Sequence, residues 1–225
     1  MSNSMPRDVK TRGLVLRRTN YGEADRVLSI ITLEGKLSVM ARGVRKARSK
    51  LAGAVEMFTL SELNIHFGRS EMGVLTGARM VRHFGELVKD LAKLELASEM
   101  LRRVDRAAEG ANTAEYYNIV EQSLTGLNDG IDAELVEAWY ELHLKKAIGE
   151  EINLYRDTLG CRLTADEKYE WNGMEEAFEV TSGGKFGSDE IKLLRLMQVA
   201  ELATVQRIKC DKNTMREAVT LARIV

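Results

Sequence analysis

The sequence predicts an α+β, multidomain protein in which a five-stranded OB-fold β-barrel precedes an all-α helical bundle domain. Up to about Arg82 the apolar residues fall in short runs separated by turn residues, a pattern typical of strands. From about Glu86 they recur at three-, four- and seven-residue steps, a pattern typical of helices. The charge changes sign at the same point: residues 1–82 carry a net charge of +8 and residues 83–225 one of −9, although the whole chain is at −1. We therefore expect two domains, 1–82 and 83–225.

The predicted barrel takes its strands from five short apolar runs. The expected strands are residues 13–16, 27–32, 37–41, 57–65 and 73–78. Gly35 can supply the positive φ that a tight hairpin between the second and third strands needs. The fourth run is long enough to bend from one side of a small barrel to the other. An OB-fold is the expected closure because it leaves few free strand edges.

The second domain is predicted to be helical, with one interruption. The expected helical segments are residues 87–101, 117–124, 136–152, 188–202 and 214–225. Asp132 is a good N-cap for the third segment. Between about residues 162 and 187 the helical pattern fails, so we expect an irregular insertion or a small hairpin there.

The composition indicates a cytoplasmic protein. No apolar run approaches the roughly 18 residues that cross a bilayer, and residues 1–10 lack a secretory apolar segment. The two cysteines, Cys161 and Cys210, lie 49 positions apart and form neither a disulfide framework nor a zinc knuckle. This cysteine usage agrees with a reducing compartment, and we expect both residues to be ordinary buried or half-buried thiols.

Sequence signatures of catalysis are missing. The chain has no phosphate-binding loop, no dinucleotide-binding motif, no zinc-protease motif and no nucleophile elbow. His66, His83 and His143 stand apart from one another and are expected to be packing or surface residues. Glu23 and Asp25 could form a metal or acid/base dyad, but hydrogen bonds to backbone N–H groups are the expected role in a turn between strands.

The densest motif is the basic segment from Arg42 to Lys50, which holds five cations in nine residues directly after the third expected strand. Such a run repels itself unless a polyanion compensates it, and each phosphate that it neutralises releases counterions. We expect it to bind nucleic-acid phosphates with little sequence preference; a solvated loop is the alternative. Arg17 and Arg18 add charge on the first strand. Tyr21 is the candidate exposed ring, with packing on its own loop as the alternative.

Four stretches fall in the order and spacing of the RecO family of bacterial recombination mediators: residues 13–16 (GLVL), 21–26 (YGEADR), 32–36 (TLEGK) and 42–50 (RGVRKARSK). The chain resembles this family specifically through about residue 80, and the remainder agrees in length and class. The resemblance implies an OB-fold followed by a helical domain. It also implies a non-enzymatic protein that binds single- and double-stranded DNA and anneals complementary strands. With RecR, such a protein helps to load RecA recombinase onto DNA covered by single-strand-binding protein. A nucleoid-associated location follows.

The resemblance also assigns residues. The family's DNA-binding segment corresponds here to five cations: Arg42, Arg45, Lys46, Arg48 and Lys50. Arg17 and Arg18 are an extension of that set. Many relatives carry a four-cysteine zinc module, whereas this chain has Gly187 where a cysteine is expected and contains no C-x-x-C. Because such a site needs four thiolates, we expect no zinc and no other cofactor, and we expect the insertion to keep its shape by packing alone.

Two other functions stay open. The barrel could serve a structural adaptor that contacts protein and binds no DNA, or the chain could be a nuclease, although the seven acidic residues of the basic half are scattered. The family's single-strand-binding protein partner offers an acidic tail that ends in an apolar residue, which would need a basic rim around an apolar groove. Six cations are candidates for that rim, and the sequence does not choose among them: Lys145, Lys146, Arg156, Lys192, Arg195 and Arg207.

Overall fold

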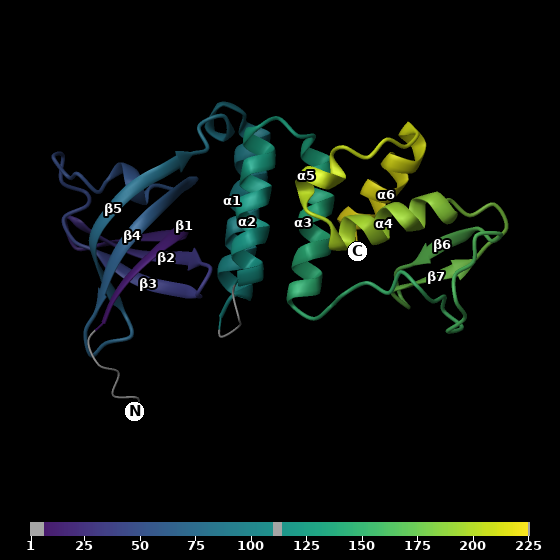
Figure 1. Ribbon diagram of the computed structural model, residues 1–225, viewed down its shortest axis with the longest axis horizontal. Helices are drawn as coiled ribbons and strands as arrows, with labels where there is room; N and C mark the ends of the chain where they lie inside the picture. Colours follow the sequence, from purple (N-terminus) through teal and green to yellow (C-terminus); the bar gives the residue numbers. More distant parts are fainter. Residues whose placement is uncertain (1–6, 110–113, 225) are drawn as a thin grey trace. The chain divides into compact units, whose positions relative to one another are not determined.

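The computed structural model describes residues 7–109 and 114–224. Residues 1–6, where the predicted first domain begins, and Val225, the predicted end of the last helix, lie outside these ranges. By their internal contacts, the residues up to Asn128 and those from Asp129 onward form two compact units. Figure 1 shows the barrel and two long helices in the first unit, and the remaining helices with a small hairpin in the second.

Four antiparallel strand pairs and one parallel pair close the predicted barrel. Its strands are β1 (Arg7–Tyr21), β2 (Asp25–Thr32), β3 (Lys36–Ala41), β4 (Thr59–Phe67) and β5 (Gly73–His83). They follow one another around the barrel in the order β1-β2-β3-β5-β4, with β3 and β5 parallel. Val15, Leu28 and Ile65 are among the apolar side chains that form its core. The predicted fold class is confirmed, and Gly35 has the expected positive φ, at 151°.

The first strand is much longer than its apolar run predicts. Its N-terminal part pairs with β4, from Arg7 opposite Phe67 onward, and its C-terminal part pairs with β2 as far as Tyr21 opposite Asp25. One strand therefore serves two neighbours, which closes the barrel. Most residues at both ends of β1 are polar and exposed, so the hydrophobic pattern marks only the middle of the strand.

The first unit also contains the helices α1 (Leu91–Ala107) and α2 (Ala114–Asn128) and two short turns, η1 (Gly53–Val55) and η2 (Leu87–Lys89). Both long helices contact the barrel, α1 on β1 and α2 on β1 and β2. Leu14, Leu16 and Ile31, which are neighbours of the core residues Val15 and Ile30 along their strands, are buried as well. These strands are thus apolar on both faces. The helices that the sequence predicts as one bundle fall into two groups.

The second unit holds α3 (Ala133–Ala147), α4 (Ser188–Val199), α5 (Leu202–Val205) and α6 (Lys212–Ile224). Its α3, α4 and α6 contact one another. Asp132 caps α3 as predicted, accepting from the N–H groups of residues 134 and 135. Two predicted helices end early, and both expectations were wrong. α3 ends at Ala147 because Gly149 adopts a φ of 86°, and α4 ends at Val199 because Ala200 is extended.

The predicted insertion contains a hairpin of β6 (Tyr169–Asn172) and β7 (Ala177–Val180). Its core is aromatic: the ring of Phe178 makes edge contacts with Tyr169, Trp171 and Phe186 at centroid distances of 5.2–6.1 Å. Gly184 passes so close to this hairpin that a Cβ would lie 2.4 Å from the carbonyl oxygen of Tyr169.

The expectation for the cysteines was wrong, because Cys161 and Cys210 are both exposed. Each lies in a loop between secondary-structure elements, and the residues on either side of it in the sequence are exposed as well. None of the helices in the described ranges is long and apolar enough to cross a membrane.

Candidate nucleic-acid interface

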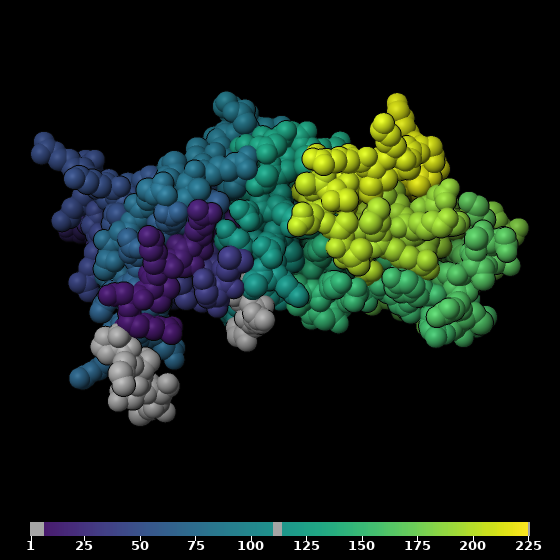
Figure 2. Space-filling view, in the orientation of Figure 1, coloured from purple at the N-terminus to yellow at the C-terminus, as the bar shows by residue number. Residues whose placement is uncertain are grey.

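The segment Arg42–Lys50, called the basic loop below, leaves β3 at the end of the barrel. Its one fully apolar buried residue, Val44, is 2% exposed and joins the barrel core. Its five cations are all exposed. In Figure 2 the loop stands out from the barrel at the left, in dark blue. Val44 thus holds the loop on the barrel while its charged residues face solvent.

Hydrogen bonds attach the basic loop to the turn between β1 and β2. The N–H of Gly43 donates to the Asp25 carboxylate at 2.7 Å, and the N–H of Arg45 donates to the Ala24 carbonyl at 2.9 Å. The Arg45 guanidinium also donates to the carbonyl of Gly22 at 3.1 Å. A φ of 64° at Gly43 makes this turn possible. The role predicted for Asp25, hydrogen bonding to a backbone N–H, is confirmed.

Within the described ranges, the cations of the basic loop have no ion-pair partner. Among residues 7–109 and 114–224, no carboxylate lies within 4.0 Å of the charged nitrogens of Arg42, Arg45, Lys46, Arg48 or Lys50. Surface cations are usually paired or dispersed, since clustered like charges repel one another. The loop therefore presents positive charge that is available to an external anion.

Two further arginines extend this charge at the end of the barrel. Arg18 and Arg26 share one carboxylate, that of Glu56, with Arg26 at 2.8 Å. Burial lowers the pKa of Arg26, and the nearby positive charges of Arg18 and Arg45 lower it further. Arg26 thus lies close enough to both Arg18 and Arg45 to be repelled by each of them. Sequence reasoning missed Arg26 because its position beside the loop depends on strand register.

Arg17 lies on the other face of β1. The register of β1 against β2 shifts between Val15 and Arg17, so that Arg17 stands opposite Ser29 and Arg18 opposite Leu28. Successive residues of a strand point to opposite faces, and a bulge reverses the phase of everything after it. Arg18 therefore shares the face of the core residue Leu28, and Arg17 shares the face of Ser29. The structure brings Arg18 to the basic loop and holds Arg17 elsewhere.

On that other face Arg17 belongs to a compensated group. The carboxylate of Asp105, on α1, accepts from Arg17 at 2.7 Å and from Ser29 at 2.5 Å, and it pairs with Lys36 at 3.0 Å. Burial alone would raise the pKa of Asp105, but the hydrogen bonds from Ser29, Arg17 and Lys36 outweigh it and hold the pKa below its ordinary value. We call these four residues the Asp105 cluster.

The histidines lie far apart in the chain and contact different partners. They pair as His66 with Asp8, His83 with Thr59, and His143 with the carbonyl of Met197. Within the described ranges no three His, Cys, Asp or Glu side chains are grouped so that they could hold a metal ion.

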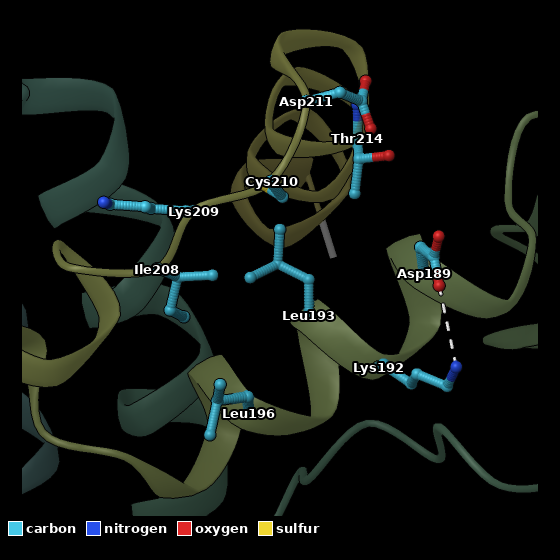
Figure 3. A pocket seen from close by; sticks show the side chains of 9 residues that line it. All are labelled: Asp189, Lys192, Leu193, Leu196, Ile208, Lys209, Cys210, Asp211 and Thr214. Carbon is cyan, nitrogen blue, oxygen red and sulfur yellow. Dashed lines mark hydrogen bonds and ion pairs between the residues drawn. The ribbon is translucent and has the colours of Figure 1, made fainter.

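The second unit carries a pocket of about 360 Å³ between α4 and the chain that leads into α6. Figure 3 shows Leu193, Leu196 and Ile208 in its wall, and Lys192 and Lys209 among the residues around it. The Nζ of Lys192 also lies 3.6 Å from the Oδ1 of Asp189. Of the six cations predicted for a basic rim, Lys192 lines this pocket. Lys145 lines a different one that it shares with four glutamates.

The fold and this surface define a class: an OB-fold barrel with a basic loop whose cations have no carboxylate partner in the described ranges, continued by a helical region that carries a pocket of apolar and charged residues. Comparison with known proteins specifies the family. Residues 5–84 match the family described as "Recombination protein O N terminal", and residues 88–223 match "Recombination protein O C terminal". The chain belongs to the RecO family.

Curated relatives cover nearly the whole chain. The chain is similar to the DNA repair protein RecO of Roseiflexus sp. (strain RS-1), with 31% identity over 95% of this chain and 78% of the relative. It is also 28% identical to the DNA repair protein RecO of Dehalococcoides mccartyi, over 94% of this chain and 87% of the relative. The DNA repair protein RecO of Bacillus cytotoxicus is 28% identical over 94% of this chain and 88% of the relative. These relatives support a role in DNA repair and recombination.

Proposed function

We propose that the protein is a non-enzymatic mediator of DNA repair that binds single- and double-stranded DNA through the basic loop and Arg18. The observation that carries this proposal is the set of five exposed loop cations without a counter-charge in the described ranges. Phosphates would supply the missing charge, and counterions released from the DNA would favour the complex. Arg17 is left out of this interface because it and Lys36 face two carboxylates, those of Asp105 and Glu109, whereas Arg18 and Arg26 share the single carboxylate of Glu56 and leave one positive charge over. Such a role places the protein in the cytoplasm, with the nucleoid.

The same surface supports strand annealing. Two complementary strands repel each other through their phosphates, and a surface that neutralises part of this charge lowers the barrier to pairing. The loop contributes charge and a few backbone groups, so binding should depend little on base sequence. With RecR as a partner, this activity would assist the loading of RecA onto DNA covered by single-strand-binding protein. The family resemblance supports RecR and single-strand-binding protein as partners.

The pocket between α4 and α6 is the proposed site for the tail of single-strand-binding protein. Leu193, Leu196 and Ile208 offer an apolar wall for the tail's last residue. Lys192 and Lys209 are the cations for its acidic residues, and they share the lining with Asp189, the partner of Lys192, and Asp211. We expect Lys192→Ala to weaken binding of a tail peptide several-fold in a fluorescence anisotropy titration. Lys145→Ala, at the glutamate-rich pocket, is the matched control. Equal binding by the Lys192 variant and the wild type would exclude this pocket.

The test of DNA binding uses a variant whose changed side chains make no contact that supports the fold. Lys46 and Arg48 are exposed, and neither side chain has a partner in the described ranges. We expect the double variant Lys46→Ala, Arg48→Ala to bind a labelled oligo-dT strand more weakly. The slope of log K against log salt should fall by about 1.4, since each single-strand phosphate contact contributes about 0.7.

The matched control removes two cations elsewhere on the barrel. Lys10 and Arg69 are exposed and likewise unpaired in the described ranges, so Lys10→Ala, Arg69→Ala changes the net charge by the same amount. We expect this control to keep the wild-type slope. Wild-type protein that binds DNA without salt dependence, or equal slopes for the two double variants, would contradict the proposal and favour an adaptor whose barrel contacts protein.

A further inference from the structure

Tyr21 is the exposed aromatic residue of the first unit. Its side chain is 60% exposed at the end of β1. The other aromatic residues of this unit are 7% exposed or less: Phe58, Phe67, Phe84, Tyr116 and Tyr117. In the described ranges the Tyr21 ring and hydroxyl make no hydrogen bond, ring contact or cation–π contact. The sequence left open whether this ring packs on its own loop, and the structure shows that it faces solvent.

The exposed ring stands at the attachment point of the basic loop. Tyr21 pairs with Asp25 across the hairpin, and the Asp25 carboxylate accepts the N–H of Gly43. The next residue, Gly22, accepts the Arg45 guanidinium through its carbonyl. Apart from its two chain neighbours, a Cβ built on Gly22 would meet no atom within 4 Å, so the turn itself is open to solvent at Gly22. Tyr21 and Asp25 lie directly opposite each other and share one face of the hairpin, which is the face of Arg17 by the alternation of β1, and the Asp25 hydrogen bond attaches the basic loop there.

We infer that Tyr21 is a stacking platform for an unpaired DNA base whose neighbouring phosphates lie on the basic loop. A tyrosine ring that is exposed to water lacks the favourable free energy of burial. A flat apolar surface that covers the ring supplies this free energy. Unpaired bases present such surfaces, and proteins that bind single strands combine aromatic faces with a positive groove. The inference rests on the proposed DNA binding and adds to it a contact with the base.

This contact separates the two kinds of DNA. Phosphates are available on single strands and duplexes alike, so the basic loop alone gives little preference between them. A base inside a duplex is stacked on its neighbours and has no free face for Tyr21. The ring therefore favours single-stranded DNA.

The experiment uses the full chain and three labelled DNAs of equal length: oligo-dT, an abasic strand and a duplex. We expect Tyr21→Ala to weaken binding of oligo-dT about tenfold, within the range measured for loss of a stacked base. Binding of the abasic strand and the duplex should change less than twofold, and the salt slope should stay the same because no charge is lost. Tyr21→Phe keeps the ring and should bind like the wild type.

Leu33→Ala is the control for removal of an exposed apolar side chain from the same barrel. Leu33 is 49% exposed in the turn between β2 and β3. The variant should bind all three DNAs like the wild type. If Tyr21→Ala binds oligo-dT like the wild type, or binds all three DNAs equally weakly, the stacking role is overturned. Wild-type protein with no salt-dependent DNA binding would instead overturn the proposed function, so the two failures are distinguishable.

Discussion

The first unit contains two groups of cations that look alike in the sequence and differ in the structure. The basic loop has five exposed cations without a counter-charge in the described ranges. In the Asp105 cluster, Arg17 and Lys36 both pair with one carboxylate on α1. Cation content therefore does not identify a binding surface. What identifies it is a cluster of exposed cations that have no carboxylate partner in the described ranges.

The two groups also do different work. The Asp105 cluster joins α1 to β1, β2 and β3, because Arg17, Ser29 and Lys36 come from those three strands. Its charges are satisfied by folding, so they contribute to stability. The charges of the basic loop are left for a ligand. Variants that affect one property and leave the other unchanged test this division.

The largest effect is expected for Asp105→Asn. Asp105 is 8% exposed, and an amide keeps its shape but removes the negative charge that Arg17 and Lys36 share. Breaking a buried ion pair costs about 3–5 kcal/mol, and solvation of the exposed Arg17 side chain reduces this to about 2 kcal/mol. We expect urea unfolding to show a loss of this size, with the DNA affinity per folded molecule unchanged.

Glu109→Gln is the matched control for this change. Its carboxylate lies 3.6 Å from the same Lys36 but is exposed, so the loss should stay below about 0.5 kcal/mol. Equal losses of unfolding free energy for the two variants would mean that the burial of Asp105 does not increase its contribution to stability. A loss of DNA binding by folded Asp105→Asn would mean that the two groups of cations are not independent.

A smaller effect is expected on acidification. The folded-state pKa of Asp105 lies below its ordinary value of 3.8, so its contribution to stability is fully present above that value and is lost as the pH falls through the folded-state pKa. The free energy of unfolding of the wild type should therefore approach that of Asp105→Asn as the pH falls from about 5 to about 3. Urea titrations at several pH values measure this difference. A constant difference would show that Asp105 has the same pKa in the folded and the unfolded protein, so that the cluster does not lower it.

Most of the barrel could be predicted from the sequence because its strands have a clear apolar pattern. Each expected strand lies within or overlaps an observed one, and the positive φ of Gly35 is in place. The grouping of the helices could not be predicted from periodicity, which shows that a helix has an apolar face but not what that face contacts. The adjacent buried residues Leu14, Val15 and Leu16 were the available signal, because a strand that is apolar on both faces needs a cover on each.

The candidate interface was predictable only in part. The cations of the basic loop are adjacent in sequence, so a single motif marks them. Arg17 and Arg18 are adjacent too, yet the bulge after Val15 and the register against β2 send them to different surroundings. Arg26 joins the interface only through its neighbours Arg18 and Arg45. Register and counter-charge arise from contacts between distant residues, and a local pattern does not contain them.

The smallest expected effect compares Arg17→Ala with Arg45→Ala, which remove the same side chain from the two groups. Arg45→Ala should lower the salt slope for single-stranded DNA by about 0.7 and the affinity about fivefold at about 0.1 M salt. Arg17→Ala should leave both unchanged and lower the free energy of unfolding by about 0.5–1 kcal/mol, because the Arg17 side chain is 63% exposed. Anisotropy titrations and urea unfolding on both variants measure the four quantities. If Arg17→Ala also lowers the slope, Arg17 contacts phosphate despite Asp105, and the interface extends across both faces of β1.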